Sequence, residues 1–334
     1  MSVRSRLTLA ELGEFGLIRR AAGIFGQRGL PGLVKGIGDD AAVVKVGHNK
    51  AIVATTDMLI EDIHFSLKYE GFFDIGWKAL AVNLSDMAAM GATPKWGLIS
   101  IGLPVGISVD SVDKLSRGIA TLARKYRVGI IGGDTVKSPG KLVINLAVLG
   151  EATPGEVIYR QGARPGDFLF VSGRIGEAAA GLAILQKKLK SRQLGAAAGI
   201  VRKYLRPEPR LKESNLIVKY GLASSMIDIS DGLHISVKFL CEQSKVGAKM
   251  YLGKIPLNHQ LSTINHQQAL RWALAGGEDY ELLFTVPKNK LKQALELFPH
   301  GMIGEITRGR DIVLLDKTGR KNISVDTGYE HFKK

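Results

Sequence analysis

The chain has 334 residues, enough for two domains, and its 45% apolar and 23% charged residues are typical of an ordinary globular protein. Its 46 basic and 31 acidic residues give a net charge of +15, which favours anionic partners such as phosphates or nucleic acids. The basic residues are scattered, without an aromatic-interleaved stripe or zinc-finger spacing. We therefore interpret the charge as a solvated surface and expect no nucleic-acid partner.

Cysteine content and hydropathy predict a cytoplasmic protein without membrane association. The one cysteine, Cys241, excludes an intramolecular disulfide, and its apolar neighbours at 235–240 favour a buried structural thiol over a nucleophile. Glu11 and Glu14 interrupt the apolar core that a signal peptide needs, and no apolar run reaches the roughly 18 residues of a membrane span. The histidines are dispersed without an HxxxH pair, which argues against a zinc site.

The first predicted elements are a helix and two strands. Residues 8–11 have capping-box spacing, and a helical stripe follows as far as Phe25. Residues 36–41 formally match the G-x-G-x-x-A dinucleotide fingerprint, but that fingerprint must open a helix. Strand-like segments at 42–46 and 51–57 follow instead, so we reject a dinucleotide-binding fold.

A buried helix around Asp86 is the element on which the rest of the chain is organised. Apolar residues recur at helical spacing from 77 to 88, and Gly91, as a left-handed cap, ends the helix together with Pro94. Asn83 and Asp86 project from one face of this apolar helix. Because a buried carboxylate needs a partner, Asp86 is paired with an arginine, a backbone cap or a metal ion.

The remaining elements predict two α/β domains with mixed, α+β-like sheets. Strands are expected at 97–103, 142–149, 168–171 and 281–286, and helices at 111–126 and at 182–219, the latter interrupted at 206–210. Residues 151–155 are the candidate linker between a domain of residues 1–150 and a domain of residues 151–334. The glycine turn at 172–176 opens an alanine-rich helix, and its amides are either an anion site or part of a tight turn.

Acidic residues recur at the edges of apolar segments although the chain is basic. They are Asp39/Asp40, Asp57, Asp86, Asp134, Asp228/Asp231 and Glu278/Asp279. Each alone is compatible with a cap or a turn, but one shared site explains them together. Like charges about 4 Å apart repel by roughly 1–4 kcal/mol per pair, so such a site needs cations. An all-oxygen set selects Mg²⁺ or Mn²⁺, which typically share their ligands with substrate phosphates.

Glycines beside the acids support nucleotide-dependent phosphoryl transfer. Those at 36–38 and 132–133 let the backbone approach a phosphate closely. No Walker A loop is present, because the Gly-Lys pairs at 140–141 and 253–254 are not followed by Ser or Thr, and the protein-kinase motifs are missing too. The phosphates are therefore expected to be held by metal ions rather than by a lysine-bearing loop.

Eight segments resemble the thiamine-monophosphate kinase family. They are residues 38–41, 55–57 with 64–65, 83–92, 132–135, 160–167, 228–233, 277–282 and 328–332. They follow the family's order over nearly the whole chain, and the last two are specific within the wider aminoimidazole-ribotide synthetase-like superfamily. The resemblance implies an ATP-dependent kinase that makes thiamine diphosphate from thiamine monophosphate. It also implies an N-terminal domain that pairs across a homodimer. The strands at 51–57, 97–103 and 142–149 alternate poorly, which indicates sheets covered on both faces, one of them by a partner chain.

The resemblance also implies roles for individual residues. Mg²⁺, as several ions per site, would be held by Asp40, Thr55, Thr56, Asp57, Asp86, Asp134, Asp228 and Asp231. ATP, the co-substrate, would contact Gly133, Asp134, Arg160 and Ser230, and thiamine monophosphate would contact His64, Glu278 and Tyr329. No side chain is implied as a general acid, general base or nucleophile. One departure is Ser116, where family members often place a tyrosine against the nucleotide.

Other interpretations remain at this stage. An aminoimidazole-ribotide synthetase or selenophosphate synthetase type of enzyme belongs to the same superfamily, although the reactive cysteine of the latter is missing near the N-terminus. The C-terminal cysteine of a related hydrogenase maturation factor is absent as well. From a different class, the chain could be a basic nucleic-acid-binding protein on a degenerate enzyme fold, against which the retention of all the metal-type acids argues.

Overall fold

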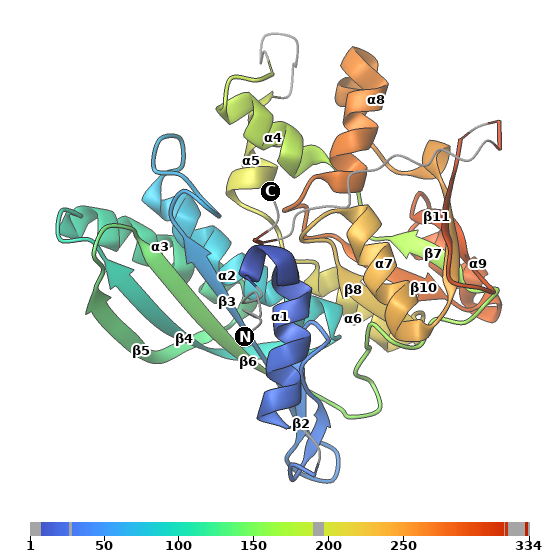
Figure 1. The fold of residues 1–334 in the computed structure, drawn as a ribbon, viewed down its shortest axis with the longest axis horizontal. Helices are drawn as coiled ribbons and strands as arrows, with labels where there is room; N and C mark the ends of the chain where they lie inside the picture. Colours follow the sequence, from blue (N-terminus) through green and yellow to red (C-terminus); the bar gives the residue numbers. More distant parts are fainter. Residues whose placement is uncertain (1–7, 27–28, 190–196, 317, 320–330, 333–334) are drawn as a thin grey trace, which may run out of the picture.

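The computed structural model describes residues 8–26, 29–189, 197–316, 318–319 and 331–332, and within them the chain forms two six-stranded sheets (Figure 1). The first sheet has the order β1-β2-β3-β6-β4-β5 and the second the order β12-β9-β11-β7-β10-β8. The strands of the first sheet are β1 (Leu33–Lys35), β2 (Ala42–Lys45), β3 (Ala51–Ile60), β4 (Thr93–Leu103), β5 (Gly129–Lys137) and β6 (Val143–Ala152). Those of the second are β7 (Phe168–Val171), β8 (Ser225–Asp228), β9 (Gly247–Tyr251), β10 (Leu282–Val286), β11 (Met302–Thr307) and β12 (Ile312–Leu315). The prediction of mixed α/β sheets is confirmed.

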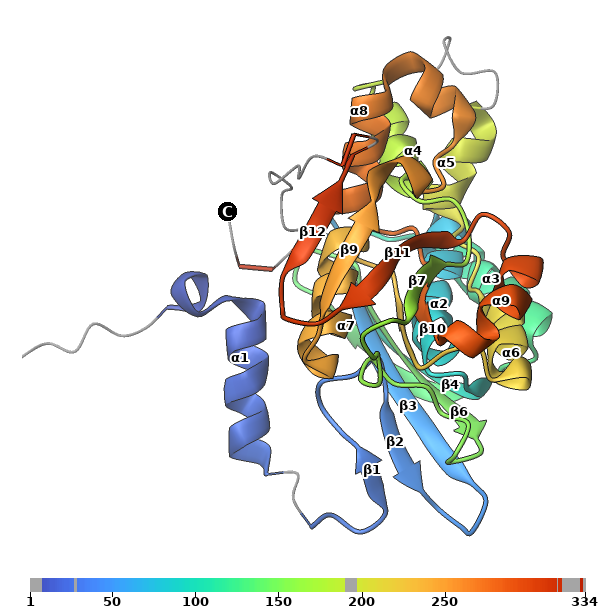
Figure 2. The same cartoon turned by 90° about the vertical axis from the view of Figure 1, so that its right-hand side faces the viewer.

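Helices cover these sheets and connect them. They are α1 (Leu9–Phe25), α2 (Phe72–Ala89), α3 (Val109–Tyr126), α4 (Glu177–Leu185), α5 (Ala197–Leu205), α6 (Leu211–Tyr220), α7 (Leu233–Ser244), α8 (His259–Ala275) and α9 (Leu291–Leu297), with short 3₁₀ turns at Leu252–Lys254 and Lys288–Lys290. Figure 2 shows α1 beside the main body, with the second sheet facing the viewer. None of the described helices is long and apolar enough to cross a membrane.

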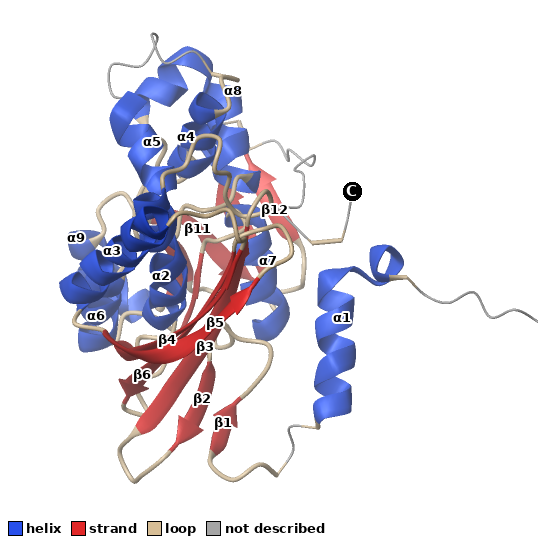
Figure 3. Ribbon diagram, turned by 90° about the vertical axis from the view of Figure 1, so that its left-hand side faces the viewer, coloured by secondary structure: helices blue, strands red, loops and turns tan. Residues whose placement is uncertain are grey.

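The first sheet has one face packed against helices and one face that is largely open. β3 and β6 are long antiparallel partners, whereas β4 and β5 run parallel. Buried and half-buried residues alternate along β6, and β5 is exposed throughout. Figure 3 shows α2 and α3 on the same side of this sheet. The expectation that both faces are covered therefore does not hold within a single chain.

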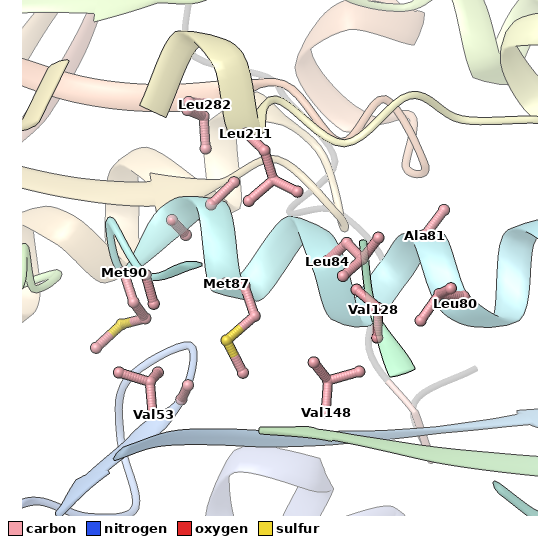
Figure 4. Packing of buried hydrophobic residues seen from close by; sticks show 14 of the residues in the cluster. Val53, Leu80, Ala81, Leu84, Met87, Met90, Val128, Val148, Leu211 and Leu282 are labelled. Carbon is pink, nitrogen blue, oxygen red and sulfur yellow. The ribbon is translucent and has the colours of Figure 1, made fainter. Parts of the chain in front are cut away.

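Helix α2 forms the core between the two sheets. Leu80, Leu84, Met87 and Met90 are fully buried. Figure 4 shows α2 between the first sheet and the first residues of α6 and β10, Leu211 and Leu282. Burying one such side chain contributes about 1.5–3 kcal/mol, so this helix is fixed by packing rather than by its intrinsic propensity.

The predicted end of α2 is confirmed in part. Met90 is the C-cap of α2. Gly91 follows with φ of 68°, a left-handed conformation that glycine adopts without steric cost. Pro94, by contrast, is the second residue of β4. The helix is therefore ended by the glycine, and the proline already belongs to the next strand.

The structure tests the interpretations of two glycine-rich segments, residues 36–41 and 172–176. Residues 36–41 form bends that lead into β2 and not a helix, which confirms the rejection of a dinucleotide-binding fold. Amides at the end of the turn at 172–176 do bind an acidic group, but this group is a side chain of the same chain and not a ligand. Asp279 accepts hydrogen bonds from the amides of Gly176, at 2.6 Å, and Ala178, at 3.1 Å. This carboxylate caps α4.

Candidate active site

A cavity of about 820 Å³ lies where α2, β3 and the loops before α7 and β10 meet. Its walls include the carboxylates of Asp57, Asp86, Asp228, Asp231 and Glu278. Pockets for small molecules typically measure about 300–1,000 Å³, so this one can hold a nucleotide-sized or cofactor-sized ligand. The convergence of acidic side chains in its wall identifies it as the candidate active site.

Three aspartates from distant parts of the chain form what we call the acid cluster. Asp40, Asp86 and Asp228 each offer one carboxylate oxygen, and these oxygens lie within 4.8 Å of one another. Asp40 lies in the bends before β2, Asp86 lies in the last turn of α2, and Asp228 ends β8. The fold thus brings together residues that are up to 188 positions apart (40 to 228).

Asp57 and Asp231 flank the acid cluster. Burial is the largest cause of a raised pKa for all of these aspartates, and the neighbouring carboxylates raise the pKa values further. The pKa of Asp40 is raised to about 7 and that of Asp231 to about 6, while the pKa of Asp86 lies well above its ordinary value. Without a cation, burial and mutual repulsion therefore oppose the simultaneous ionisation of these five carboxyl groups.

Hydroxyl groups and one arginine partly compensate the acid cluster. Asp86 accepts a hydrogen bond from the Thr55 hydroxyl, and Asp228 accepts one from Ser85 at 2.6 Å. Arg160 donates from Nε to Asp40 at 3.0 Å and also forms an ion pair with it. Among the described residues, the hydrogen-bond partner of Asp86 is thus a hydroxyl group and neither an arginine nor a backbone cap. One guanidinium cannot neutralise three carboxylates.

The donor set suits Mg²⁺. Oδ2 of Asp40 is buried without a hydrogen-bond partner in the part of the chain that the structure describes. Such an atom is costly unless it meets a cation. The cluster offers oxygen ligands only, as Mg²⁺ prefers, and the cavity leaves room for water and phosphate in the remaining coordination positions.

The structure separates some residues that the sequence placed in one site. Thr56 points to the other face of β3, where its hydroxyl donates to Asn145 at 2.8 Å. Asp134 lies on the exposed edge strand β5, opposite Ser100 of β4, and is not among the cavity-lining residues. Asp279 caps α4 as described above. Within one chain, therefore, the acids do not all share a single site.

Gly133 lies on the same edge strand as Asp134. With φ of 156°, its backbone approaches Ile99 so closely that a Cβ atom would lie 1.7 Å from the Ile99 carbonyl oxygen. Packing between strands thus already accounts for this glycine. Ser116, the departure from the family pattern, is exposed on α3 and does not line the cavity.

Two of the residues expected at the substrate end, His64 and Glu278, line the cavity. Nδ1 of His64 accepts a hydrogen bond from the Ile60 amide at 3.0 Å, and burial, followed by the nearby His331, lowers the pKa of His64. Its Nε2 therefore carries the proton in the neutral ring. Ser230 and Glu278 both line the cavity, and the Ser230 carbonyl accepts a hydrogen bond from the Glu278 amide. Tyr329 lies outside the described residues.

Sequence reasoning missed Lys78, which is fully buried on α2. Its ammonium group forms ion pairs with Glu278 at 2.8 Å and Glu70 at 3.3 Å, and it lies 3.6 Å from the ring centroid of Tyr204. A lysine between Trp77 and Ala79 in an apolar helix was the available signal, because buried lysines are rare unless they are paired.

Comparisons with known proteins agree with this geometry. Residues 38–152 match the family model described as AIR synthase related protein, N-terminal domain, and residues 164–317 match the C-terminal domain of the same family. A thiamine-monophosphate kinase of Bacillus subtilis is 36% identical over 307 residues, covering 89% of this chain and 93% of that protein. The one of Escherichia coli K12 is 37% identical over 330 residues, covering 96% and 98%.

A solved structure supports the same relationship at the level of the fold. The structure described as AaThiL complexed with AMPPCP and TMP superposes with a TM-score of 0.84 and 32% sequence identity. The superposition covers 98% of this chain and 99% of that one. The chain therefore matches, over nearly its full length, the fold of a protein that was solved with AMPPCP and TMP.

Proposed function

The chain belongs to the thiamine-monophosphate kinases of the AIR synthase related family, and from this premise we propose that it phosphorylates thiamine monophosphate with ATP, using Mg²⁺ held at the acid cluster. The product is thiamine diphosphate. The observation that carries the proposal is the convergence of Asp40, Asp86 and Asp228, of which Asp86 and Asp228 line a cavity of about 820 Å³. The chain matches these kinases over nearly its full length.

The acid cluster and its flanking residues are the proposed metal ligands. Asp40, Asp57, Asp86, Asp228 and Asp231 supply carboxylate oxygens that several Mg²⁺ ions can share. Bound there, Mg²⁺ supplies charge neutralisation for the ATP phosphates and the acceptor phosphate, whose mutual repulsion is the main obstacle to transfer. The Thr55 hydroxyl, which donates to Asp86, orients this carboxylate.

No general base is required for the acceptor. A phosphate monoester has a second pKa near 6, so its oxygens are mostly deprotonated at pH 7. Transfer from ATP is then direct and in line, without a phosphoenzyme. Arg160, which lies on Asp40, is the nearest fixed positive charge to the cluster, and we assign it to the ATP phosphates together with the Ser230 segment.

His64, Glu278 and Tyr329 are the proposed contacts of the thiamine portion. Burial lowers the pKa of His64, which favours its neutral ring, and Lys78 forms an ion pair with the Glu278 carboxylate. The two side chains suit a ligand that combines hydrogen-bonding groups with a cationic thiazolium ring. An aromatic ring over that cation would contribute roughly 0.5–2 kcal/mol. These residues bind and orient the acceptor, whereas the acid cluster acts on the phosphates.

We also propose that the kinase is a cytoplasmic homodimer that pairs through the open side of the first sheet. Ile131 and Val136 of β5 are more than half exposed, and the partly exposed Trp96 of β4 pairs with Gly129 at the start of β5. Pairing there would cover these apolar side chains. It would also give Gly133 and Asp134, which do not reach the cavity of their own chain, a position at a site shared between two chains.

One assay tests the proposed reaction. Purified protein is incubated with ATP, Mg²⁺ and thiamine monophosphate, and thiamine diphosphate is followed by chromatography, with EDTA in place of Mg²⁺ as the control. We expect product only with Mg²⁺ and in a 1:1 ratio with ADP. Absence of thiamine diphosphate under saturating substrates would refute the function.

A second arm tests direct transfer. The protein is incubated with γ-labelled ATP and Mg²⁺ without the acceptor, and label on the protein is measured. We expect none, because the acceptor itself is the nucleophile. Stoichiometric label that is passed on to thiamine monophosphate would replace direct transfer with a two-step route.

A further inference from the structure

Lys78 is buried in a closed set of polar contacts outside the acid cluster. Its ammonium group binds Oε2 of Glu278 at 2.8 Å and Oε2 of Glu70 at 3.3 Å, and it lies over the ring of Tyr204. Oε1 of Glu70 in turn accepts hydrogen bonds from the Tyr204 hydroxyl at 3.0 Å and the Ser66 amide at 2.9 Å. The lysine therefore connects α2 with α5, with the loop after β3 and with the loop before β10.

Within this set, Glu278 is the carboxylate that faces the cavity. Its side chain is 24% exposed and lines the cavity, whereas those of Glu70 and Lys78 are buried. One lysine between two glutamates leaves a net charge of −1 (+1 and −2). A cationic group in the cavity would thus meet a carboxylate whose position is fixed from behind by an ion pair.

The backbone of Glu278 is fixed as well. Its φ of 69° is unusual for a residue that is not glycine, and its amide donates to the Ser230 carbonyl at 2.6 Å. Such conformations are strained and persist only where the surroundings impose them. The ion pair with Lys78 and the amide bond to Ser230 hold the carboxylate in one place at both ends.

Helix α2 sets the distance between this carboxylate and the acid cluster. Lys78, Val82 and Asp86 follow one another at intervals of four residues, so they share one stripe of the helix. Val82 and Asp86 line the cavity. Eight residues of helix span about 12 Å. A ligand along this stripe would place its phosphate at Asp86 and its far end near the carboxylate that Lys78 holds.

We propose that Lys78 is a positioning residue that holds the Glu278 carboxylate on the cavity wall. The cavity along the Lys78–Val82–Asp86 stripe of α2 then selects a phosphate ester that carries a cationic ring at its far end. The inference rests on the proposed function and deepens it. Lys78 itself does not line the cavity and touches no substrate. It acts through Glu278, so it determines recognition of the acceptor and leaves transfer itself unchanged.

The test compares kinetic constants for both substrates in Lys78→Met and Lys78→Arg. In Lys78→Met, we expect KM for thiamine monophosphate to rise about ten-fold or more, with KM for ATP and kcat within about three-fold of wild type. Lys78→Arg keeps the charge and should recover part of the loss. Glu278→Gln should raise the same KM, and adding it to Lys78→Met should cause little further change, since both act on one contact.

Arg210→Met is the matched control. Arg210 also forms a largely buried ion pair, with Glu281, but does not line the cavity. The Arg210→Met variant should have a lower melting temperature but no selective change in the KM for thiamine monophosphate. If Lys78→Met does not fold, Lys78→Arg and the double variant Lys78→Met/Glu70→Gln, which leaves no unpaired Glu70 charge, replace it.

Each outcome decides the question. A selective rise in KM for thiamine monophosphate supports the positioning role. An unchanged KM, or a parallel fall of all constants as in a merely unstable variant, overturns it while the proposed function stands. A wild-type protein that does not phosphorylate thiamine monophosphate overturns both.

Discussion

At the scale of single residues, Asp86 is a carboxylate near the end of a helix that is otherwise mostly apolar and buried. Its carboxylate is close to Asp40 and Asp228, and the Thr55 hydroxyl is the donor that reaches it. Burial and the three neighbouring acids Asp57, Asp228 and Asp40 raise its pKa. In the absence of metal this side chain destabilises the folded chain at neutral pH, so a functional gain must explain why it is there.

Asp86→Asn should therefore separate activity from stability. The amide cannot serve as an anionic metal ligand, and we expect kcat to fall by roughly two orders of magnitude or more. The melting temperature in EDTA should stay level or rise, because the substitution removes a repelling charge. Steady-state kinetics and thermal melting measure the two effects.

Asp113→Asn, which changes an exposed carboxylate on α3, is the control and should alter neither. Near-wild-type activity of Asp86→Asn at saturating Mg²⁺ would show that Asp86 is a structural residue.

The raised pKa values also predict how metal-free stability depends on pH. The folded chain raises the pKa of Asp231 to about 6 and that of Asp40 to about 7, both above the unfolded value near 4. Between these limits the folded state binds more protons than the unfolded state. The contribution of these groups is thus fully present below about pH 4 and is lost as the pH rises to about 7.

Mg²⁺ should reverse this loss, because it binds the ionised carboxylates. We expect the rise in melting temperature on adding Mg²⁺ to be larger at pH 8 than at pH 5, and saturation to about 100 times Kd stabilises by about 2.7 kcal/mol. Thermal melts with Mg²⁺ and with EDTA at both pH values measure the difference. An equal shift at pH 5 and pH 8 would contradict the assignment of the metal to these aspartates.

The sequence predicted residues whose signal is local and missed those whose partners are distant in the chain. Asp86 was identifiable because a carboxylate stands out in an apolar helical stripe. Asp279 was grouped with the other acids because nothing near it in sequence shows that it caps α4, whose first turn is 101 residues away. The pairing of Lys78 with Glu278, 200 residues apart, depends on tertiary packing and has no local signature.

At the scale of elements, α2 and α3 pack through two glycines. A Cβ atom on Gly118 would lie 2.0 Å from the Phe73 carbonyl oxygen, and one on Gly76 would lie 2.0 Å from the Leu115 carbonyl oxygen. The two helix backbones therefore touch. Helix propensity alone disfavours glycine here, and only the close approach explains it.

Gly118→Ala should push α3 away from α2 and displace Val82 and Asp86, the residues of α2 that line the cavity. Overpacking of this kind costs roughly 1–3 kcal/mol, which lowers the melting temperature, and kcat/KM should fall with it. Gly23→Ala on α1 is the matched control, since a Cβ atom there meets nothing within 4 Å. It should be neutral or stabilise by up to about 1 kcal/mol. Equal melting temperatures of the two variants would show that α3 can shift freely.

At the scale of the whole molecule, the sequence predicted mixed sheets but not which faces of these sheets the helices cover. Runs of apolar residues at 97–103 and 142–149 correctly indicated strands, yet they could not show that the helices cover one face only. β5 carries Ile130, Ile131 and Val136 on an exposed edge strand. Long exposed apolar edges are avoided in monomers because they invite pairing, so this side of the molecule demands a cover.

Ile131→Asp should therefore convert a dimer into a monomer. Ile131 is 59% exposed in the single chain, and a carboxylate buried against a second apolar face would lack a partner. Light scattering at micromolar concentration should give twice the chain mass of 36.1 kDa for wild type and the single mass for the variant. Leu295→Asp on α9, beside the second sheet, is the control and should remain dimeric.

Activity distinguishes two versions of this pairing. If Asp134 contributes to a site shared between chains, the monomeric Ile131→Asp variant loses ATP turnover together with its dimer mass, and Asp134→Asn loses turnover while it stays dimeric. If the cavity of one chain is complete, the monomeric variant remains active, because the acid cluster and Glu278 come from a single chain. A wild-type mass of 36.1 kDa would refute the dimer itself and leave Asp134 outside the site.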